Sequence, residues 1–301
     1  MISIIVCTYN RELYLPKMLN SVAKQNCNRD DFELIIVDNN STDNSSQICK
    51  NFESSNINIY YFLEKKQGLS FARNRGIKEA KGNFLVFIDD DAFLDKCYIK
   101  ELKKYLANID GDVGFGGKIL PYLECELPKW MSDYLSPLMS IIDLGSKIKL
   151  FKGYKYPIGA NMGVSKSIIS KIGTFNEKLG RTGKSMMGGE EKDFFHRIKK
   201  SKIPIYYFPK MLVNHVIPSE RLTVQFIRTQ ALGIGRSEYI RVKNDGILAV
   251  FKKINQELVK WVISFLLLFW HLLTFKFQKG WMIIRFRCWV SIGILQGLIN
   301  R

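Results

Sequence analysis

The sequence lacks the motifs that identify several large enzyme classes. No Gly-x-Gly-x-x-Gly follows the first apolar segment, and no Gly-x-x-x-x-Gly-Lys-Ser/Thr occurs anywhere. These two absences argue against a dinucleotide-dependent dehydrogenase and against a P-loop enzyme. The chain also has no Gly-x-Ser-x-Gly turn, which α/β-hydrolases use to expose a nucleophile.

Zinc motifs and targeting signals are also missing. None of the six cysteines belongs to a Cys-x-x-Cys pair, so no zinc site is indicated, and a reducing compartment fits best. The chain begins directly with an apolar strand and shows neither the basic segment nor the cleavage site of a signal peptide. We therefore expect it to act on the cytoplasmic side of a membrane.

Acidic residues are few relative to basic ones, and the net charge is +17. Such an excess attracts nucleic acid, anionic lipid or phosphorylated substrates. A polyanion-binding protein without transferase activity is therefore one alternative. Much of the excess lies in the apolar tail, where an anionic membrane surface explains it equally well, and we do not expect nucleic acid as a partner.

The first half of the chain alternates apolar strands with amphipathic helices. Strands are predicted over 3–8, 32–37, 57–62 and 84–88, and helices over 13–25, 42–52 and 71–80. This βαβ pattern predicts a parallel, doubly wound sheet with right-handed crossovers. Later, strands are predicted over 113–117, 158–165, 205–208 and 213–216, a helix over 188–200, and further helix from 223 onward.

Asp89, Asp90 and Asp91 end the apolar run 84–88. Three adjacent carboxylates repel one another unless a positive charge lies among them. Hard oxygen ligands suit Mg²⁺ or Mn²⁺, which can bridge to substrate phosphates, and the carboxyl edge of an α/β sheet is where ligands bind. The alternative is a solvated turn whose aspartates cap a helix.

The other strands of the first half also end in polar groups. Thr8, Tyr9 and Arg11 follow the first strand, and Asp38 ends the second. Tyr9 could stack on a base, Asp38 could accept hydrogen bonds from a base or ribose, and Arg73 could pair with a diphosphate. Considered alone, Tyr9 and Arg73 are more often packing and surface residues.

Two further features carry chemistry. Glu190, Glu191 and Asp193 follow a Gly-Gly pair at a predicted helix start, where a carboxylate could act as general base. Acidic residues are also favoured in the first turn of any helix by its dipole. His215 closes a short strand, as a metal-site residue or as a buried, hydrogen-bonded histidine.

Together these motifs resemble the inverting family 2 of nucleotide-sugar glycosyltransferases, whose catalytic domain has the GT-A fold. Matching segments appear in family order over residues 1–217: 4–11, 35–43, Gly68 with 72–74 and Gly76, 87–91, 159–162, Gly173 with Phe175, 189–191, and His215. The resemblance implies an α/β, GT-A type fold with a mostly parallel central sheet flanked by helices, followed by a helical, apolar C-terminal appendage.

The resemblance also implies a domain plan and donor-site roles. Residues 1–217 would form the catalytic domain, with a nucleotide-binding half (1–118) and an acceptor-binding half (119–217), and residues 218–301 a membrane-associating region. Donor binding would fall to Thr8, Tyr9, Arg11, Asp38, Arg73, Asp89 and Asp90. The metal, Mn²⁺ or Mg²⁺, would be held by Asp91 with Asp89, and approached by His215.

Glu191 stands where the family usually carries an aspartate as catalytic base. This departure in residue type leaves Glu190 or Asp193 as alternatives. The implied reaction moves a sugar from a nucleotide-sugar, UDP being the commonest donor nucleotide, to a hydroxyl of a glycan or lipid-linked acceptor in cell-surface polysaccharide or glycolipid synthesis. A nucleotidyltransferase is a nearer alternative, but the missing Gly-rich phosphate loop counts against it.

The C-terminal tail is intensely apolar. The run from Trp261 to Phe275 is shorter than the roughly 20 residues that a spanning helix needs. Arg285 and Arg287 interrupt a second stretch from Gly280 to Ile299. Aromatic and basic residues around short apolar helices favour peripheral or monotopic attachment to the cytoplasmic face of a membrane. The alternative is a helical pair that packs on the catalytic domain or on another subunit.

Overall fold

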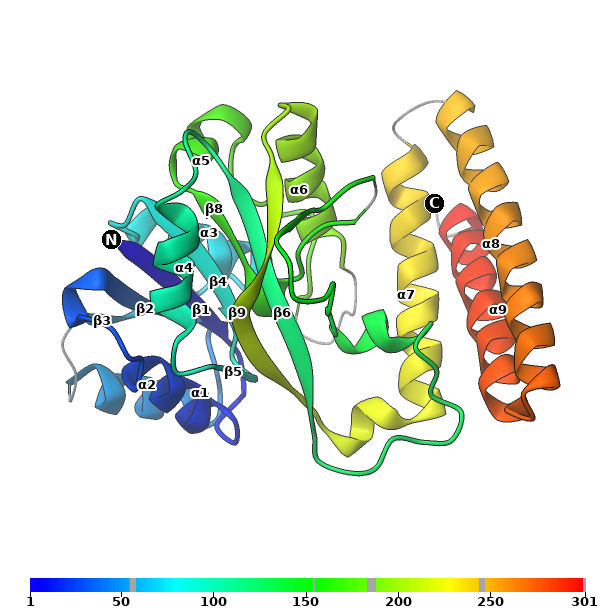
Figure 1. Ribbon diagram of the computed structural model, residues 1–301, viewed down its shortest axis with the longest axis horizontal. Helices are drawn as coiled ribbons and strands as arrows, with labels where there is room; N and C mark the ends of the chain where they lie inside the picture. The colour runs from blue at the N-terminus through cyan, green and yellow to red at the C-terminus, as the bar shows by residue number, and fades with distance from the viewer. Residues whose placement is uncertain (55–57, 154, 183–187, 244–246, 300–301) are drawn as a thin grey trace. The chain divides into compact units, whose positions relative to one another are not determined.

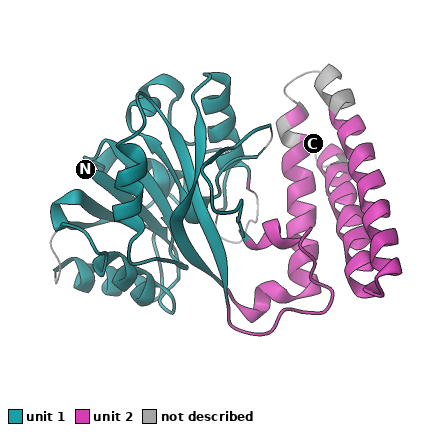
Figure 2. Cartoon of the chain, in the orientation of Figure 1, with its two compact units in different colours: residues 1–122, 140–184, 189–216 teal, residues 123–139, 185–188, 217–301 magenta. Residues whose placement is uncertain are grey.

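The computed structural model describes residues 1–301 apart from 55–57, 154, 183–187, 244–246 and 300–301. The chain divides into two compact units (Figure 2). Unit 1 comprises residues 1–122, 140–184 and 189–216, and unit 2 comprises 123–139, 185–188 and 217–301. The last of these divisions falls between residues 216 and 217. Residues 123–139, expected in the acceptor-binding half, belong to unit 2.

The sheet is parallel on one side and antiparallel on the other. The strands are β1 (Ile2–Thr8), β2 (Phe32–Asp38), β3 (Ile59–Leu63), β4 (Phe84–Asp89), β5 (Ala92–Leu94), β6 (Gly114–Leu123), β7 (Lys149–Leu150), β8 (Met162–Ser165) and β9 (Ile205–Ile217). Their order is β3-β2-β1-β4-β8-β6-β9-β5 (Figure 1). Strand β7 pairs with β9. The first four strands in this order are parallel, as predicted, and β8 is antiparallel to both β4 and β6.

Helices cover both faces of the sheet, because side chains alternate between faces along each strand. The helices of unit 1 are α1 (Leu15–Ala23), α2 (Ser45–Ser54), α3 (Leu69–Glu79), α4 (Tyr98–Leu106), α5 (Ser167–Ile172) and α6 (Glu190–Lys200). On β1, Ile4 and Val6 pack in one core with α1, α2 and α4. Ile5 packs in the other core with α3, α5 and α6. The central strands are therefore buried on both sides, as their apolar runs predicted.

The two strands predicted over 205–208 and 213–216 are one strand, β9, which continues through Pro209. The prediction of two separate strands was wrong. Proline has an extended φ compatible with a strand and lacks only the N–H. Pro209 lies between the ladder to β7, which uses Tyr206 and Tyr207, and the ladder to β5, which begins at Val213.

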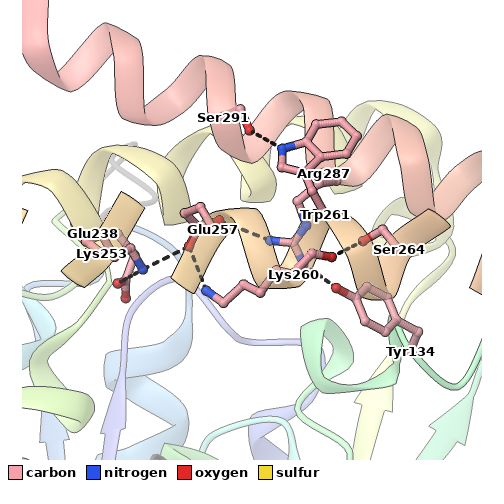
Figure 3. A network of polar contacts seen from close by, with 9 residues as sticks. All are labelled: Tyr134, Glu238, Lys253, Glu257, Lys260, Trp261, Ser264, Arg287 and Ser291. Atoms are coloured by element: carbon pink, nitrogen blue, oxygen red, sulfur yellow. Dashed lines mark hydrogen bonds and ion pairs between the residues drawn. The ribbon is translucent and has the colours of Figure 1, made fainter. Parts of the chain in front are cut away.

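Unit 2 is built around α7 (Val224–Lys243), α8 (Ile247–Leu273) and α9 (Phe277–Ile299), which confirms the helical prediction for this region. Helices α7 and α9 cross closely, because a Cβ at Gly235 would lie 2.2 Å from the Val290 carbonyl oxygen and one at Gly293 would lie 2.3 Å from that of Leu232. Helix α8 is joined to α9 by a hydrogen bond of 3.2 Å from Trp261 Nε1 to Ser291 Oγ (Figure 3).

We predicted that the apolar run from Trp261 is too short to span a membrane. This prediction was wrong because the candidate segment begins before Trp261. Within the described residues, Lys253–Leu273 of α8 is a 21-residue segment that contains an 18-residue stretch of mean hydropathy 1.4, and it is long and apolar enough to cross a membrane by length and composition. The count from Trp261 missed the apolar residues that the helix carries before it. Val262, Leu266, Phe269 and Leu273 are each about 60 % exposed, at the spacing of one helix face.

Candidate functional site

The polar ends of β1, β2 and β4 lie side by side. In the parallel register Thr8 is opposite Asp38 on β2, and Cys7 is opposite Asp89 on β4. The sequence predicted that these polar strand ends lie along one edge of the sheet, because the carboxyl ends of parallel strands lie at the same edge. The loops after β1 and β2 are tied to each other, since the Asn10 side chain accepts from Thr42 N at 2.8 Å and the Arg11 N–H donates to Ser45 Oγ at 2.9 Å.

His215, on a strand that is distant in the sequence, lies beside the aspartates that follow β4. Asp90 and Asp91 form the turn between β4 and β5, and β5 pairs antiparallel with β9 so that Ala92 is opposite His215. Ligand atoms of Asp89, Asp91 and His215 all lie within 4.8 Å of one another. His215 Nε2 is 3.1 Å from Asp91 Oδ1, and both side chains are buried. Two carboxylates with an imidazole form a donor set that fits Mn²⁺ or Mg²⁺.

Arginines provide positive charge beside the aspartates. Arg11 Nε is 3.5 Å from Asp90 Oδ1, and Arg11 Nη2 is 3.5 Å from Asp91 Oδ2. Burial raises the pKa of Asp90 to about 7, and Arg11 only partly opposes this rise. Arg11, predicted as a donor-binding residue, is therefore also a counter-ion of the triplet. Tyr9 is 37 % exposed at the same edge.

Arg73 joins the aspartates to the acidic start of α6. Its Nη1 donates to Glu190 Oε1 and its Nη2 to Glu191 Oε1, both at 3.0 Å, and Nη2 lies 3.8 Å from Asp89 Oδ1. The guanidinium is buried and lies 5.3 Å from the centre of the Phe175 ring. This contact with Phe175 was not predicted, although both residues belong to the motif segments.

The three acidic residues of α6 have different surroundings. Glu190 is almost fully buried, whereas the Glu191 side chain is 20 % exposed. Burial raises the pKa of Glu191 to about 7, with smaller contributions from Glu190 and Asp89 and an opposing one from Arg73. Asp193 is not brought to this cluster, because it pairs with Arg197 one helical turn later at 2.9 Å.

Asp38 is held by groups that the sequence analysis missed. The carboxylate is fully buried, and its Oδ2 accepts from Tyr61 Oη at 2.9 Å and from Ser46 Oγ. Its Oδ1 accepts from the Ser41 N–H at 2.9 Å. Only the alternating pattern of the third strand could have pointed to Tyr61. Thr8, at the end of the adjacent strand, is also buried.

Gly159 lies against the Arg73–Glu191 ion pair. A Cβ at this position would be 2.2 Å from Arg73 Nη2 and 2.2 Å from Glu191 Oε1. The short turn that carries Gly159 also contains Asn161, which fixes it with two hydrogen bonds. The Asn161 side chain accepts from Tyr98 Oη at 2.7 Å and donates to the Met211 carbonyl at 2.7 Å. The glycine is therefore required for the close approach of the turn to both charged groups.

We expect Gly159→Ala to displace the ion pair and to destabilise unit 1 by about 1–3 kcal/mol, the usual cost of overpacking. Urea unfolding measures this change. Gly188→Ala is the matched control, because a Cβ there meets no atom of the described residues within 4 Å. Equal midpoints for the two variants would contradict the assigned contact.

Comparison with known proteins places these features in a family. The sequence model of the family described as Glycosyl transferase family 2 matches residues 3–173. Glycosyltransferase GlyA of Streptococcus pneumoniae is 36 % identical over 115 residues, which are 38 % of this chain and 16 % of that protein. Poly(ribitol-phosphate) beta-N-acetylglucosaminyltransferase TarS of Staphylococcus aureus is 34 % identical over 37 % of this chain and 20 % of its own length. The match therefore spans a fifth or less of these two relatives.

Another relative aligns along the whole chain. The dolichyl N-acetyl-alpha-D-glucosaminyl phosphate 3-beta-D-2,3-diacetamido-2,3-dideoxy-beta-D-glucuronosyltransferase of Methanococcus voltae is 26 % identical over 99 % of this chain and 97 % of its own length. Among solved structures, mannosyltransferase PcManGT from Pyrobaculum calidifontis superposes with a TM-score of 0.64 at 15 % identity, covering 100 % of this chain and 87 % of its own. S. aureus TarS gives 0.53 at 19 % identity, covering 80 % and 42 %. These structures confirm the predicted fold class.

Proposed function

The chain belongs to glycosyltransferase family 2, and from this premise we propose that it is a metal-dependent, inverting glycosyltransferase that uses a UDP-sugar. The observation that carries the proposal is one continuous charged cluster at the carboxyl edge of the sheet. In this cluster the buried Arg73 links the metal-compatible triad, through Asp89, to the partly open carboxylate of Glu191. A donor diphosphate needs the first two, and an acceptor hydroxyl needs the third.

The donor would bind across the ends of β1, β2 and β4. Asp89, Asp91 and His215 would hold the divalent cation, which when bound offsets the charge of the donor diphosphate. Arg73 is held in place by Glu190 and Glu191 and can face the same diphosphate with little loss of side-chain entropy. Structures of the TarS neighbour with UDP and UDP-GlcNAc support UDP, whereas the PcManGT neighbour was solved with GDP-Man and Mn²⁺.

Glu191 would act as the general base. Its carboxylate is oriented by Arg73 and is more open than that of Glu190. It would take the proton from an acceptor hydroxyl as that oxygen attacks the anomeric carbon from the face opposite the leaving diphosphate, so that configuration inverts. The turn at Gly159 lies against Glu191 and would line the acceptor side.

The acceptor would be a glycan or a lipid-linked glycan in cell-surface polysaccharide or glycolipid synthesis. Relatives named for such substrates support this, among them TarS and the GalNAc(5)-diNAcBac-PP-undecaprenol beta-1,3-glucosyltransferase of Campylobacter jejuni. Unit 2 would attach the enzyme peripherally or monotopically to an anionic, cytoplasmic membrane face. The exposed apolar stripe of α8 and the basic excess of the chain support this attachment.

Thermal unfolding in the presence of UDP- and GDP-sugars, with and without Mn²⁺, tests the proposal. A ligand at about 100 times its Kd adds about 2.7 kcal/mol to the free energy of unfolding. We expect a UDP-sugar to stabilise the protein only when Mn²⁺ is present. Stabilisation by a polyanion such as DNA, without any response to nucleotide-sugars, would instead favour the polyanion-binding alternative.

A further inference from the structure

The buried ring of Phe175 contacts each element that carries the charged cluster. The Arg73 Cζ atom lies over this ring, 5.3 Å from its centre. The ring stacks on Phe194 of α6, with centres 4.3 Å and planes 19° apart. It is also perpendicular to Phe87 of β4, with centres 5.3 Å apart. One side chain therefore packs against Arg73, against the helix of the acidic residues and against the strand that leads to the aspartates.

The contact with Phe175 restricts a motion of Arg73 that its ion pairs leave open. The carboxylates of Glu190, Glu191 and Asp89 all contact the two terminal nitrogens of the guanidinium. These contacts fix the end of the side chain, whereas an aromatic ring packs against the flat face of the group. Attraction between a cation and a ring is strongest where water is excluded, and both side chains are buried here.

The backbone of Phe175 is itself held by the residue that follows Arg73 on α3. The Phe175 N–H donates to Asn74 Oδ1 at 2.9 Å, and Asn74 Nδ2 donates to the Phe175 carbonyl at 2.9 Å. The same segment is tied to α3 again where Ser70 Oγ donates to the Leu179 carbonyl at 2.7 Å. The helix that carries Arg73 therefore also fixes the ring against which Arg73 packs.

We propose that Phe175 and Asn74 are positioning residues, which immobilise the Arg73 guanidinium where it can face the donor diphosphate and orient Glu191. Neither residue touches a substrate in this role. A cation that is already immobilised loses less side-chain entropy when the donor binds, so the affinity for the diphosphate increases. The role rests on the function proposed above and adds two residues to it.

Nitrogen-15 NMR of the arginine side chains measures the immobilisation without any donor. A guanidinium with restricted rotation about its Cζ–Nε bond gives separate signals for its two terminal nitrogens. We expect separate signals for Arg73 in the full chain, identified by their loss in Arg73→Lys. In Phe175→Met these signals should merge, because methionine fills a similar apolar volume but has no ring.

Calorimetric titration with UDP in the presence of Mn²⁺ measures the consequence for donor binding. We expect Phe175→Met to weaken UDP binding about tenfold, the scale of a cation–ring contact from which water is excluded. Phe195→Met is the matched control. Phe195 is equally buried in the same core and also contacts Phe194, but Arg73 lies over the ring of Phe175. The control should keep the separate signals and the UDP affinity.

Three results would overturn the proposal: averaged Arg73 signals in the unsubstituted chain, separate signals with unchanged UDP affinity in Phe175→Met, or equal effects in Phe195→Met. If Phe175→Met does not fold, Asn74→Ala decides the question, because it leaves the ring in place and should also merge the signals. If the unsubstituted chain binds no nucleotide but the signals merge only in Phe175→Met and Asn74→Ala, the proposed donor is wrong and the positioning of Arg73 stands.

Discussion

Replacing Glu191 by Gln is expected to lower kcat by a factor of about 10²–10⁴, the usual contribution of a general base. The amide keeps the size of the side chain and can still accept a hydrogen bond from Arg73, but it cannot take a proton. Donor affinity should therefore change little. Steady-state transfer rates, together with donor titrations of the same variant, measure the two quantities separately.

The pH profile provides a check that a merely structural role would not reproduce. Burial raises the pKa of Glu191 to about 7, and a base must be deprotonated to act. The rate should therefore rise with pH and level off above about 7, and it should fall about tenfold per unit at lower pH. Glu191→Gln should abolish this ascending limb. Unchanged turnover in that variant would contradict the assignment of the base.

Asp193→Asn is the matched comparison, because the sequence alone left Asp193 as an alternative base. In the structure it pairs with Arg197, and Arg197 in turn donates to the Thr174 carbonyl at 2.8 Å. We expect this variant to keep both its rate and its pH profile. Loss of the ascending limb in Asp193→Asn, but not in Glu191→Gln, would reassign the base.

The local sequence pattern was sufficient to predict the strands of the parallel half of the sheet and their direction. The apolar runs that end at Thr8, Asp38 and Asp89 alternate with helical segments, and parallel strands must then place their ends along one edge. The clustering of these three residues follows from topology alone. The resemblance to a family added roles for them but was not needed to place them together.

Contacts between distant segments could not be predicted in the same way. His215 reaches Asp91 because β9 pairs with the three-residue strand β5, which has no pattern of its own. The choice of Glu191 as the proposed general base, among the acidic residues of α6, depends on Arg73. That residue is more than 100 positions earlier in the chain. Each of these contacts depends on tertiary packing that residue spacing does not encode.

Replacing Asp91 by Asn should weaken Mn²⁺ binding by about 100-fold or more, because it removes a charged oxygen ligand from the triad. Asp91 is buried between His215 and the Arg11 guanidinium, so an amide of the same shape should be accommodated there. Calorimetry with Mn²⁺ alone measures the affinity. The stabilisation that Mn²⁺ gives to thermal unfolding should disappear in the same variant.

Asp90→Asn separates ligation from general charge attraction, since it removes the same charge from the same turn. Its carboxylate pairs with Arg11 and is not a member of the triad formed by Asp89, Asp91 and His215. We expect it to reduce Mn²⁺ affinity by about tenfold, the lower end of the usual cost of a loss outside the ligand set. Equal losses in the two variants would mean that the turn attracts cations without ligating one, and unchanged affinity in Asp91→Asn would place the metal elsewhere. A large loss confined to Asp91→Asn would tie the metal to the residue that β9 and β5 bring against His215, the part of the site that depends on the antiparallel half of the sheet.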